Sequence, residues 1–360
     1  MELNTSPQQD GFYFPAEYAP QQAVWLAWPE RPDNWRLQGK PAQKAFAAIA
    51  NAINEVVPVS MIVSEQQYSD AKQILDASIE LIEMDYNDAW MRDIGPTVLT
   101  NNSGERRAVS WQFNSWGGDF NGLYSPWNND DQVARKISDL LSLDYYQAPF
   151  VLEGGAIHTD GEGTLYTTEE CLLSPGRNPH LDKNEIEKLL SEYLGIKKIV
   201  WIPRGLYNDE TDGHVDNLMH VVGPAKVVLS WTDDSSDPQY EISQQAFEIL
   251  TSSVDAKGRQ IEVTKLPIPG PLYMTDKEAS EIAPSDGMVR QGNERLAGSY
   301  ANFLMVNNNL FLPALDEKQD KVVANILADL MPEYKIILLP AHEVLLGGGN
   351  IHCISQQIPQ

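Results

Sequence analysis

The chain has 360 residues, of which 42% are hydrophobic, and its formal net charge at pH 7 is −25. This hydrophobic content, with nine Trp, fourteen Tyr and nine Phe, excludes an intrinsically disordered chain. The acidity argues against nucleic acid and anionic membranes as partners, because both are bound through Lys and Arg. It favours a cationic ligand, although it also fits a role in solubility alone.

The cysteines and the amino terminus indicate the compartment. Two cysteines are too few for a disulfide framework. The opening segment, MELNTSPQQDGFYFPAEYAP, lacks the basic start and apolar run of a signal peptide. The sequence has no apolar run near the ~18–20 residues that a membrane span requires. We therefore expect a cytosolic protein with reduced thiols and no membrane partner.

Amphipathic helical patterns are each followed by a short β-rich run. In the first helix, Phe46, Ile49, Ala50 and Ile53 share one face. The predicted helices and the strands after them are 41–56 and 57–63, 183–195 and 197–203, 240–258 and 259–267, and 316–334 and 334–340.

A second recurrence, typical of β-hairpins, interleaves with the first. Alternating apolar runs surround turn residues in segments that begin near residues 93, 153, 213, 298 and 348. The last segment, GGGNIHCISQQIP, resembles only the first half of a hairpin, and it is apolar enough to be buried. The repeating unit is thus a hairpin, a helix and a strand, used about five times.

This repetition predicts the fold class. Such units do not bury their faces alone and tend to close around an axis, so we expect an α/β repeat fold that closes on itself. An ordinary open α/β sheet is the alternative. Because no linker divides the chain, we expect a single domain over residues 1–360.

Polar residues that can do chemistry cluster at the starts of the hairpins: Asp93, Glu153, His214, Asp216 and Cys353. If the units surround an axis, these residues meet in one pocket. A thiolate is a strong nucleophile, His214 would transfer its proton, and Glu153 would orient that histidine. The two aspartates oppose thiolate formation unless the substrate is cationic, and carboxylates grip a planar guanidinium in bidentate fashion.

Each of these residues also has a structural interpretation. Asp93 follows Arg92 and would form a surface ion pair, and Glu153 would be a turn carboxylate. His214 and Asp216, two residues apart, would share one face of a strand.

The remaining histidines and Cys171 are expected to be structural. His352 would point away from its neighbour Cys353, so it is not expected to be the base. Cys171 would be a thiol in a loop or strand.

A zinc site is a competing interpretation. The possible ligands are Glu153, His214, Asp216 and Cys353. The sequence lacks the CxxC, HxxxH and HExxH spacings, and we therefore expect no metal.

Six segments in order resemble agmatine deiminase, a family of the guanidino-group-modifying superfamily: WMRDIGP, LEGGAIHTDGEGTLYTTEECLL, RNPHL, DGHVDN, RLAGSYANF and GGGNIHCISQQIP. The resemblance covers essentially the whole chain. It implies a five-bladed α/β propeller of ββαβ-type repeats with pseudo-fivefold symmetry, and a homodimer. It also implies hydrolysis of agmatine to N-carbamoylputrescine and ammonia, without metal or organic cofactor.

The resemblance also implies roles. Cys353 corresponds to the nucleophile and would form a covalent S-alkylthiouronium intermediate. His214 corresponds to the general acid and base, Asp93 and Asp216 to the carboxylates that grip the guanidinium, and Glu153 to a residue beside the histidine.

We expect the outer part of the pocket to select the far end of the substrate. Glu210 and Asp212 precede the catalytic histidine and would meet the distal amine, while Trp90 would wall the slot. The glycines at 347–349, Gly348 included, would let the backbone approach the substrate. An Arg for the α-carboxylate of arginine is not evident, because Arg92 and Arg295 fit ion-pair roles. The alternatives are a peptidylarginine or arginine deiminase and a non-enzymatic binding module for cationic ligands.

Overall fold

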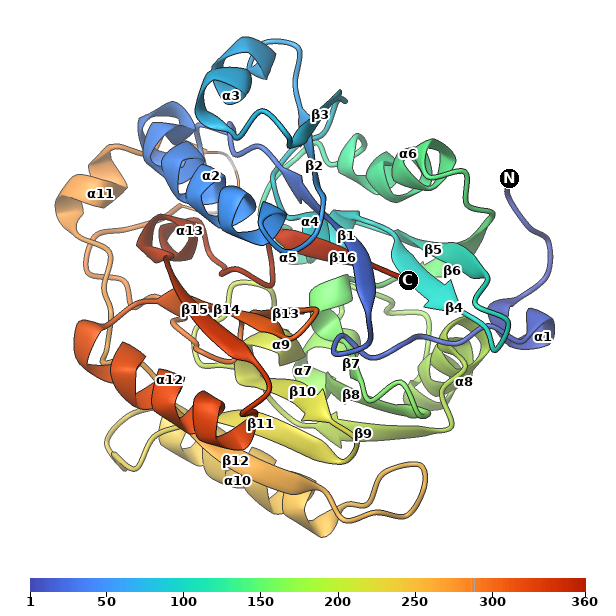
Figure 1. The fold of residues 1–360 in the computed structure, drawn as a ribbon. Coiled ribbons are helices and arrows are strands. Elements are labelled where there is room, and N and C mark those ends of the chain that lie inside the picture. Colours follow the sequence, from blue (N-terminus) through green and yellow to red (C-terminus); the bar gives the residue numbers. More distant parts are fainter. Residues whose placement is uncertain (286, 288) are drawn as a thin grey trace.

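Five small sheets form the framework of the computed structural model, which describes residues 1–285, 287 and 289–360 (Figure 1). Sheet by sheet, the strands are β16 (Ser355–Pro359), β1 (Gln21–Ala27), β2 (Val59–Val63) and β3 (Glu80–Glu83); β4 (Thr97–Thr100), β5 (Arg106–Gln112) and β6 (Tyr145–Val151); β7 (His158–Thr159), β8 (Thr164–Thr168) and β9 (Lys198–Ile202); β10 (Met219–Gly223), β11 (Lys226–Trp231) and β12 (Glu262–Pro267); and β13 (Leu304–Val306), β14 (Asn309–Ala314) and β15 (Lys335–Pro340).

Most of the α-helices are short. They are α1 (Pro7–Asp10), α2 (Lys40–Asn54), α3 (Tyr68–Ile74), α4 (Met91–Ile94), α5 (Gly118–Asn121), α6 (Val133–Leu140), α7 (Glu169–Leu172), α8 (Lys183–Leu194), α9 (Val215–Leu218), α10 (Gln239–Ser252), α11 (Asp276–Ser280), α12 (Glu317–Leu330) and α13 (His342–Leu346). The 3₁₀ turns are η1 (Arg36–Gly39), η2 (Asp130–Gln132) and η3 (Gly154–Ala156).

Every sheet repeats one pattern. Two strands pair in antiparallel fashion, and a helix then leads to a third strand that pairs in parallel with the second strand, as in β10, β11, α10 and β12. The other sheets pair in the same order. Figure 1 shows the crossover helices α2, α6, α8, α10 and α12 on the outer side of the sheets. The predicted unit of hairpin, helix and strand is therefore confirmed.

The two ends of the chain complete one sheet together. β16 pairs antiparallel with β1, where Val24 faces Gln357, and β1 pairs parallel with β2. All five residues of β16 are buried. The tail thus lies inside the protein, as its apolar composition predicts, and its hairpin partner is the strand at the opposite end of the sequence.

Local sequence explains where the long helices begin and end. Asp182 caps α8 by accepting from the backbone N–H of Glu185, whose side chain accepts from the N–H of Asp182 in return. Gly195 ends the helix at φ +68°, a conformation that favours glycine. In α2, Phe46, Ile49 and Ile53 are fully buried, as the helical pattern predicts.

The predicted helices and strands lie close to those in the structure, with differences at several boundaries. The helix predicted over 240–258 ends at Ser252, because the following residues form a separate turn. In that turn Asp255 accepts from the backbone N–H groups of Lys257 and Arg259. None of the helices in the described ranges is long and apolar enough to span a membrane.

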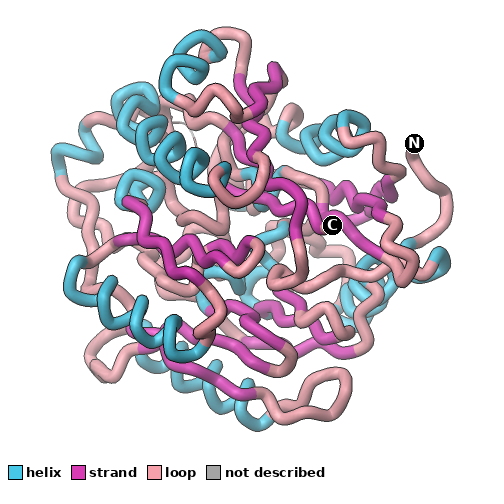
Figure 2. The backbone as a smooth tube through the Cα atoms, viewed as in Figure 1, coloured by secondary structure: helices cyan, strands magenta, loops and turns pink. Residues whose placement is uncertain are grey.

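Single helical turns precede the first strand of several sheets. The helix α4 comes before β4, the turn η3 before β7, and α9 before β10. Residues 351–354 form an equivalent turn before β16. Figure 2 shows how much of the chain between the strands is loop. The polar residues singled out in the sequence lie in or beside these turns.

Candidate active site

A pocket of about 540 Å³, including the solvent space at its mouth, gathers segments far apart in the sequence. Asp93, His214 and Cys353 line it together with Trp90 and Trp116. Asp216 and Glu153 are fully buried directly behind this lining. Of the five residues expected to meet in one pocket, three therefore line it and two lie buried beside it.

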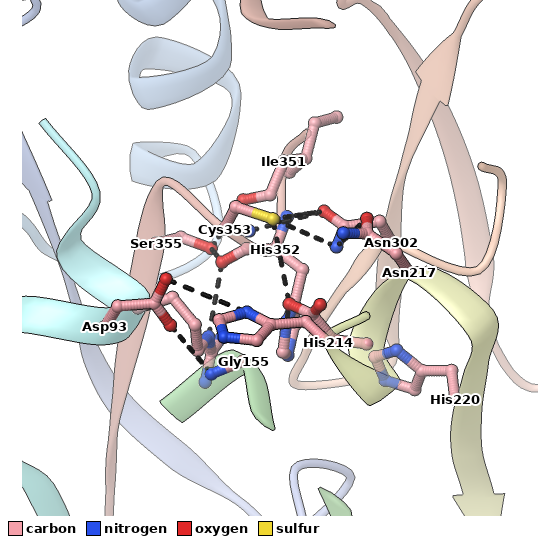
Figure 3. A network of polar contacts seen from close by, with 12 residues as sticks. Asp93, Gly155, His214, Asn217, His220, Asn302, Ile351, His352, Cys353 and Ser355 are labelled. Carbon is pink, nitrogen blue, oxygen red and sulfur yellow. Dashed lines mark hydrogen bonds and ion pairs between the residues drawn. The ribbon is translucent and has the colours of Figure 1, made fainter. Parts of the chain in front are cut away.

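Cys353 is held between an amide and a carboxylate, and Figure 3 shows the amide of Asn302 beside its sulfur. The Nδ2 group of Asn302 donates to its Sγ at 3.1 Å, and Oδ2 of Asp216 lies 3.7 Å from the same sulfur. The thiol is buried. Burial, followed by the charges of Asp216 and Asp93, raises the pKa of Cys353 well above its usual range. The thiol is therefore protonated in the unliganded protein at neutral pH.

His214 lies between two acidic groups at the start of α9. Its Nδ1 is 3.9 Å from Oδ2 of Asp93, and its Nε2 is 3.8 Å from Oε2 of Glu153. Both distances exceed those of hydrogen bonds. Burial alone would lower the pKa of His214, but Asp93, Cys171 and Glu153 together raise it well above the usual range. The ring is therefore protonated at neutral pH and can donate a proton.

The Asp93 carboxylate is fixed by two donors and remains easily protonated. Its Oδ1 accepts from the backbone N–H of Gly155 at 2.8 Å, and its Oδ2 accepts from Nε1 of Trp116 at 2.9 Å. Burial, together with the charges of Asp216 and Glu153, raises the pKa of Asp93 to about 6. A cation in the pocket would relieve this repulsion.

The Asp216 carboxylate is ionised, and only one of its two oxygens forms a hydrogen bond with the described residues. Its Oδ2 bonds with Nδ1 of His352 at 2.8 Å. Its Oδ1 is buried without a hydrogen-bond partner among the described residues. Burial opposes ionisation, but His352 holds the pKa of Asp216 below its usual value. A buried charged oxygen without a partner is costly, so Oδ1 is well suited to accept from a ligand.

Two glycines make room for these groups. A Cβ on Gly155 would lie 2.5 Å from Nδ1 of His214 and 3.1 Å from Oδ2 of Asp216. A Cβ on Gly349 would lie 3.1 Å from Sγ of Cys353. A side chain at Gly155 would therefore overlap with His214, and one at either glycine would crowd Asp216 or Cys353.

The charge of Glu153 is balanced by Arg177, a residue that sequence analysis did not single out. Nε of Arg177 donates to Oε1 of Glu153 at 2.9 Å, and both side chains are fully buried. Arg177 also donates to the carbonyl oxygens of Trp116 and Thr211. Burial opposes ionisation, but Arg177 holds the pKa of Glu153 below its usual value. The sequence feature that could have identified Arg177 is the RNPHL segment, of which it is the first residue.

The outer pocket matches the expectations in part. Trp90, Glu210 and Gly348 line it. Gly348 has φ +108°, in the region that favours glycine. Arg290 lines the pocket as well and forms an ion pair with Glu210. Two arginines, Arg31 and Arg290, thus line the pocket, although neither Arg92 nor Arg295 does.

Asp212 has different surroundings from those expected. Its Oδ2 accepts from Arg177 at 2.8 Å and from the Ser174 hydroxyl at 3.0 Å. It lies outside the pocket lining that the described residues form. The carboxylate completes the shell around Arg177, and this position does not favour contact with a distal amine.

Two further local expectations differ from the structure. His214 and Asp216 do not share a strand, because His214 caps α9 and Asp216 lies in its first turn. Cys171 lies in the helical turn α7, fully buried beside His214 and Glu153. The strand predicted at His214 and Asp216 is therefore a helical turn in the structure.

Within the part of the chain that the structure describes, two groups of side chains have metal-ligand atoms close together, and neither favours a cation. The first comprises Glu153, Cys171 and His214, and here Arg177 already supplies the positive charge. The second comprises His158, His220 and His352. Both ring nitrogens of His352 face carboxylate oxygens, so they carry protons and cannot ligate a metal.

Comparison with known proteins agrees with the geometry. The model of the Porphyromonas-type peptidyl-arginine deiminase family matches residues 13–359. A Vibrio parahaemolyticus protein named as a candidate agmatine deiminase is 64% identical over 100% of both chains. The structure of the Enterococcus faecalis agmatine deiminase is 44% identical, with a TM-score of 0.97, covering 99% of this chain and 98% of that one.

A C. jejuni agmatine deiminase solved with substrate bound is more distant. It is 28% identical, with a TM-score of 0.84, covering 97% of this chain and 96% of that one. The matches span the whole repeat and all the segments that contribute to the pocket. The chain therefore belongs to the Porphyromonas-type peptidyl-arginine deiminase family, within its agmatine deiminase branch.

Proposed function

We propose that the protein hydrolyses agmatine to N-carbamoylputrescine and ammonia. The observation that carries this proposal is the position of the Cys353 thiol, which shares one pocket with Asp93 and His214 while Asp216 lies 3.7 Å from the sulfur. Such a site suits a flat cation whose central carbon is attacked by sulfur. The names of the relatives support the same substrate.

Binding comes first. The guanidinium donates to Asp93 and to the unpartnered Oδ1 of Asp216, in the bidentate manner that a planar fork allows. Its charge offsets the two carboxylates that raise the pKa of Cys353. The thiol then loses its proton to solvent, so that the substrate activates its own nucleophile.

The first chemical step releases ammonia. Sγ of Cys353 forms a bond to the guanidinium carbon and gives a neutral tetrahedral adduct. The protonated His214 donates its proton to one nitrogen, the carbon–nitrogen bond breaks and ammonia leaves. A planar, positively charged S-alkylthiouronium remains on the sulfur, stabilised by Asp93 and Asp216.

Water completes the turnover. His214, now neutral, takes a proton from a water molecule whose oxygen forms a bond to the same carbon. The hydroxyl group of this second adduct loses its remaining proton to solvent as the carbon–sulfur bond breaks, so that the thiolate is restored and the neutral ureido product departs. General acid and base assistance of this kind typically contributes ~10²–10⁴-fold to the rate. No step requires a metal or an organic cofactor.

The proposal also covers the closure of the fold, the cellular location and the oligomeric state of the protein. We infer that the five sheets close around a pseudo-fivefold axis as a five-bladed propeller, because β16 and β1 join the two chain ends in one sheet. Residues 1–360 then form a single catalytic domain. We also propose a cytoplasmic location and a homodimer, by analogy with the family.

Selectivity for agmatine over arginine is supported by the outer pocket. Arg290 would suit the α-carboxylate of arginine, but its guanidinium is already bound by Glu210 and by the carbonyl oxygen of Gly347. A carboxylate would have to displace Glu210 from this pair. The alternative substrates are arginine and peptidylarginine.

Steady-state kinetics with agmatine, arginine, a peptidylarginine and methylated arginines tests the proposal. We expect kcat/KM for agmatine to exceed the others by at least about 10³-fold, because a partly buried ion pair would have to be broken for arginine. Comparable values for arginine would assign the chain to that substrate. Binding of agmatine without turnover of any of these compounds would favour the binding module.

A further inference from the structure

A chain of buried charged groups extends from Asp216 through His352 to Glu17. Nδ1 of His352 bonds with Oδ2 of Asp216 at 2.8 Å, and its Nε2 bonds with Oε2 of Glu17 at 2.7 Å. The three side chains come from the amino-terminal segment, from α9 and from the turn before β16. All are at least nine-tenths buried.

Glu17 is itself rigidly held. Its Oε1 accepts from the backbone N–H of Met305 at 2.8 Å, and its Oε2 lies 3.9 Å from the guanidinium of Arg92. His220 approaches Oε1 to 3.4 Å. Glu17 is therefore held in place by the backbone of strand β13 and by its contacts with Arg92 and His220.

Aromatic contacts fix the ring of His352 as well. His158 stacks against it with ring centroids 5.1 Å apart, and His220 meets it edge-on at 5.3 Å. Figure 3 shows His352 and His220 on the side of Cys353 opposite Ile351. The ring has little freedom to rotate away from Asp216.

We propose that Glu17 and His352 are positioning residues that fix the carboxylate of Asp216, so that its Oδ2 is occupied and its Oδ1 is presented to the substrate guanidinium. This inference rests on the proposed deiminase reaction and deepens it. Neither residue touches the reacting atoms. They act through Asp216, whose angle to the guanidinium plane decides how well the cation is held.

The same link joins the carboxylate to the nucleophile. His352 directly precedes Cys353, and the backbone N–H groups of both residues donate to Oδ1 of Asn302, at 3.1 and 3.3 Å. Nδ2 of Asn302 donates to the sulfur. Movement of His352 would therefore shift Asp216 and Cys353 relative to each other.

Electrostatics supports the arrangement. Each ring nitrogen of His352 faces a carboxylate oxygen, so the ring is an imidazolium. Burial and Arg92 oppose this charge, yet Glu17 and Asp216 raise the pKa of His352. The other charged or titratable groups around the chain are Arg92, His158, His214, His220, Asp93 and Cys353. The imidazolium opposes the effect of burial and thereby lowers the pKa of Asp216.

A pair of matched variants separates the two bonds of His352. In His352→Asn the amide nitrogen takes the place of Nδ1, so the bond to Asp216 is kept and that to Glu17 is lost. In His352→Gln the amide nitrogen takes the place of Nε2, so the bond to Glu17 is kept and that to Asp216 is lost. His342→Gln is the control, since His342 is exposed and pairs only with Glu278 among the described residues.

The readout is the dissociation constant for agmatine in a Cys353→Ser background, measured by calorimetry, with kcat and KM in the parent enzyme. We expect His352→Gln to weaken agmatine binding at least about tenfold and to lower kcat/KM by about 100-fold or more, because a charge-assisted contact of the guanidinium is misaligned. His352→Asn should retain substantially more of both. The control should change neither.

Glu17→Gln removes a charge without changing the shape of the side chain, and it should fall between the two variants of His352. Thermal unfolding of every variant shows whether it is folded. Equal losses in His352→Asn and His352→Gln, or losses that follow the melting temperature alone, would overturn the positioning role. Absence of agmatine turnover in the unmodified enzyme would instead overturn the proposed function.

Discussion

The sulfur of Cys353 lies 3.7 Å from Oδ2 of Asp216, so the nucleophile of this site faces a carboxylate with no cation between them. That neighbour raises the pKa of the thiol and keeps it protonated in the free protein. A thiol held in this state is protected from indiscriminate reaction. It becomes a nucleophile only when a positively charged substrate offsets the acid beside it.

This relationship makes an unusual prediction for Asp216→Asn. Removing the carboxylate should lower the pKa of Cys353, and each unit gives about tenfold more thiolate near neutral pH. We expect alkylation of Cys353 by iodoacetamide at pH 7.5 to accelerate about tenfold, while kcat/KM for agmatine falls by at least about 100-fold. Peptide mapping distinguishes Cys353 from the buried Cys171. Slower alkylation in the variant would show that Asp216 does not suppress the thiolate.

The acid side of the pH profile should report Asp93. Its pKa is raised to about 6, and only the ionised form grips the guanidinium, so activity is present above this pH and lost below it. We expect the slope of log kcat/KM for agmatine against pH to increase by about one below a pH of about 6, beyond the slope that ionisation of the Cys353 thiol gives. In the weakly active Asp93→Asn variant this increase should vanish. An increase that persists in the variant would belong to a different group.

Arg177 should be essential for stability as well as for the site. Arg177→Met leaves the carboxylate of Glu153 buried without its partner, which typically costs about 3–5 kcal/mol. The measurement is the free energy of unfolding from urea denaturation. Lys40→Met is the control, because Lys40 and Asp70 form an exposed pair, expected to contribute less than about 1 kcal/mol. Similar small losses in both variants would mean that Arg177 does not neutralise Glu153.

Gly155 should tolerate no side chain. Gly155→Ala places a methyl group 2.5 Å from Nδ1 of His214, so the ring must move away from the reacting carbon. We expect kcat to fall at least about 100-fold, since small displacements of a catalytic group are costly. Gly223→Ala is the control, because its new carbon would lie 3.7 Å from the nearest neighbour. Near-normal kcat in Gly155→Ala would show that the pocket adapts.

The sequence predicted those parts of the structure that depend on local patterns. Helical periodicity identified the long helices, and turn residues identified the hairpins, so the repeating unit could be read before any contact was known. The main catalytic candidates followed from this unit, because polar residues recur at the start of each hairpin. The resemblance to a known family added the roles.

The remaining features depend on tertiary contacts that no local pattern reveals. Arg177, Asn302 and His352 stand in quoted motifs, but their partners lie 24 to 335 residues away in the sequence. The helix α6 and the strand β1 were not predicted, since α6 spans only eight residues and β1 is a continuous apolar run that periodicity alone does not assign. Asp212 was expected at the pocket because of its place beside the histidine, yet Arg177 binds its carboxylate.

The central claim is a covalent bond between Cys353 and the carbon of the substrate. The direct test is acid quenching of a His214→Gln variant during reaction with agmatine, followed by mass spectrometry of the denatured chain and its peptides. We predict an added mass equal to agmatine minus ammonia on the peptide that contains Cys353, and no such mass in Cys353→Ser. Turnover by Cys353→Ser near the normal rate, or an adduct on Cys171 instead, would contradict the mechanism.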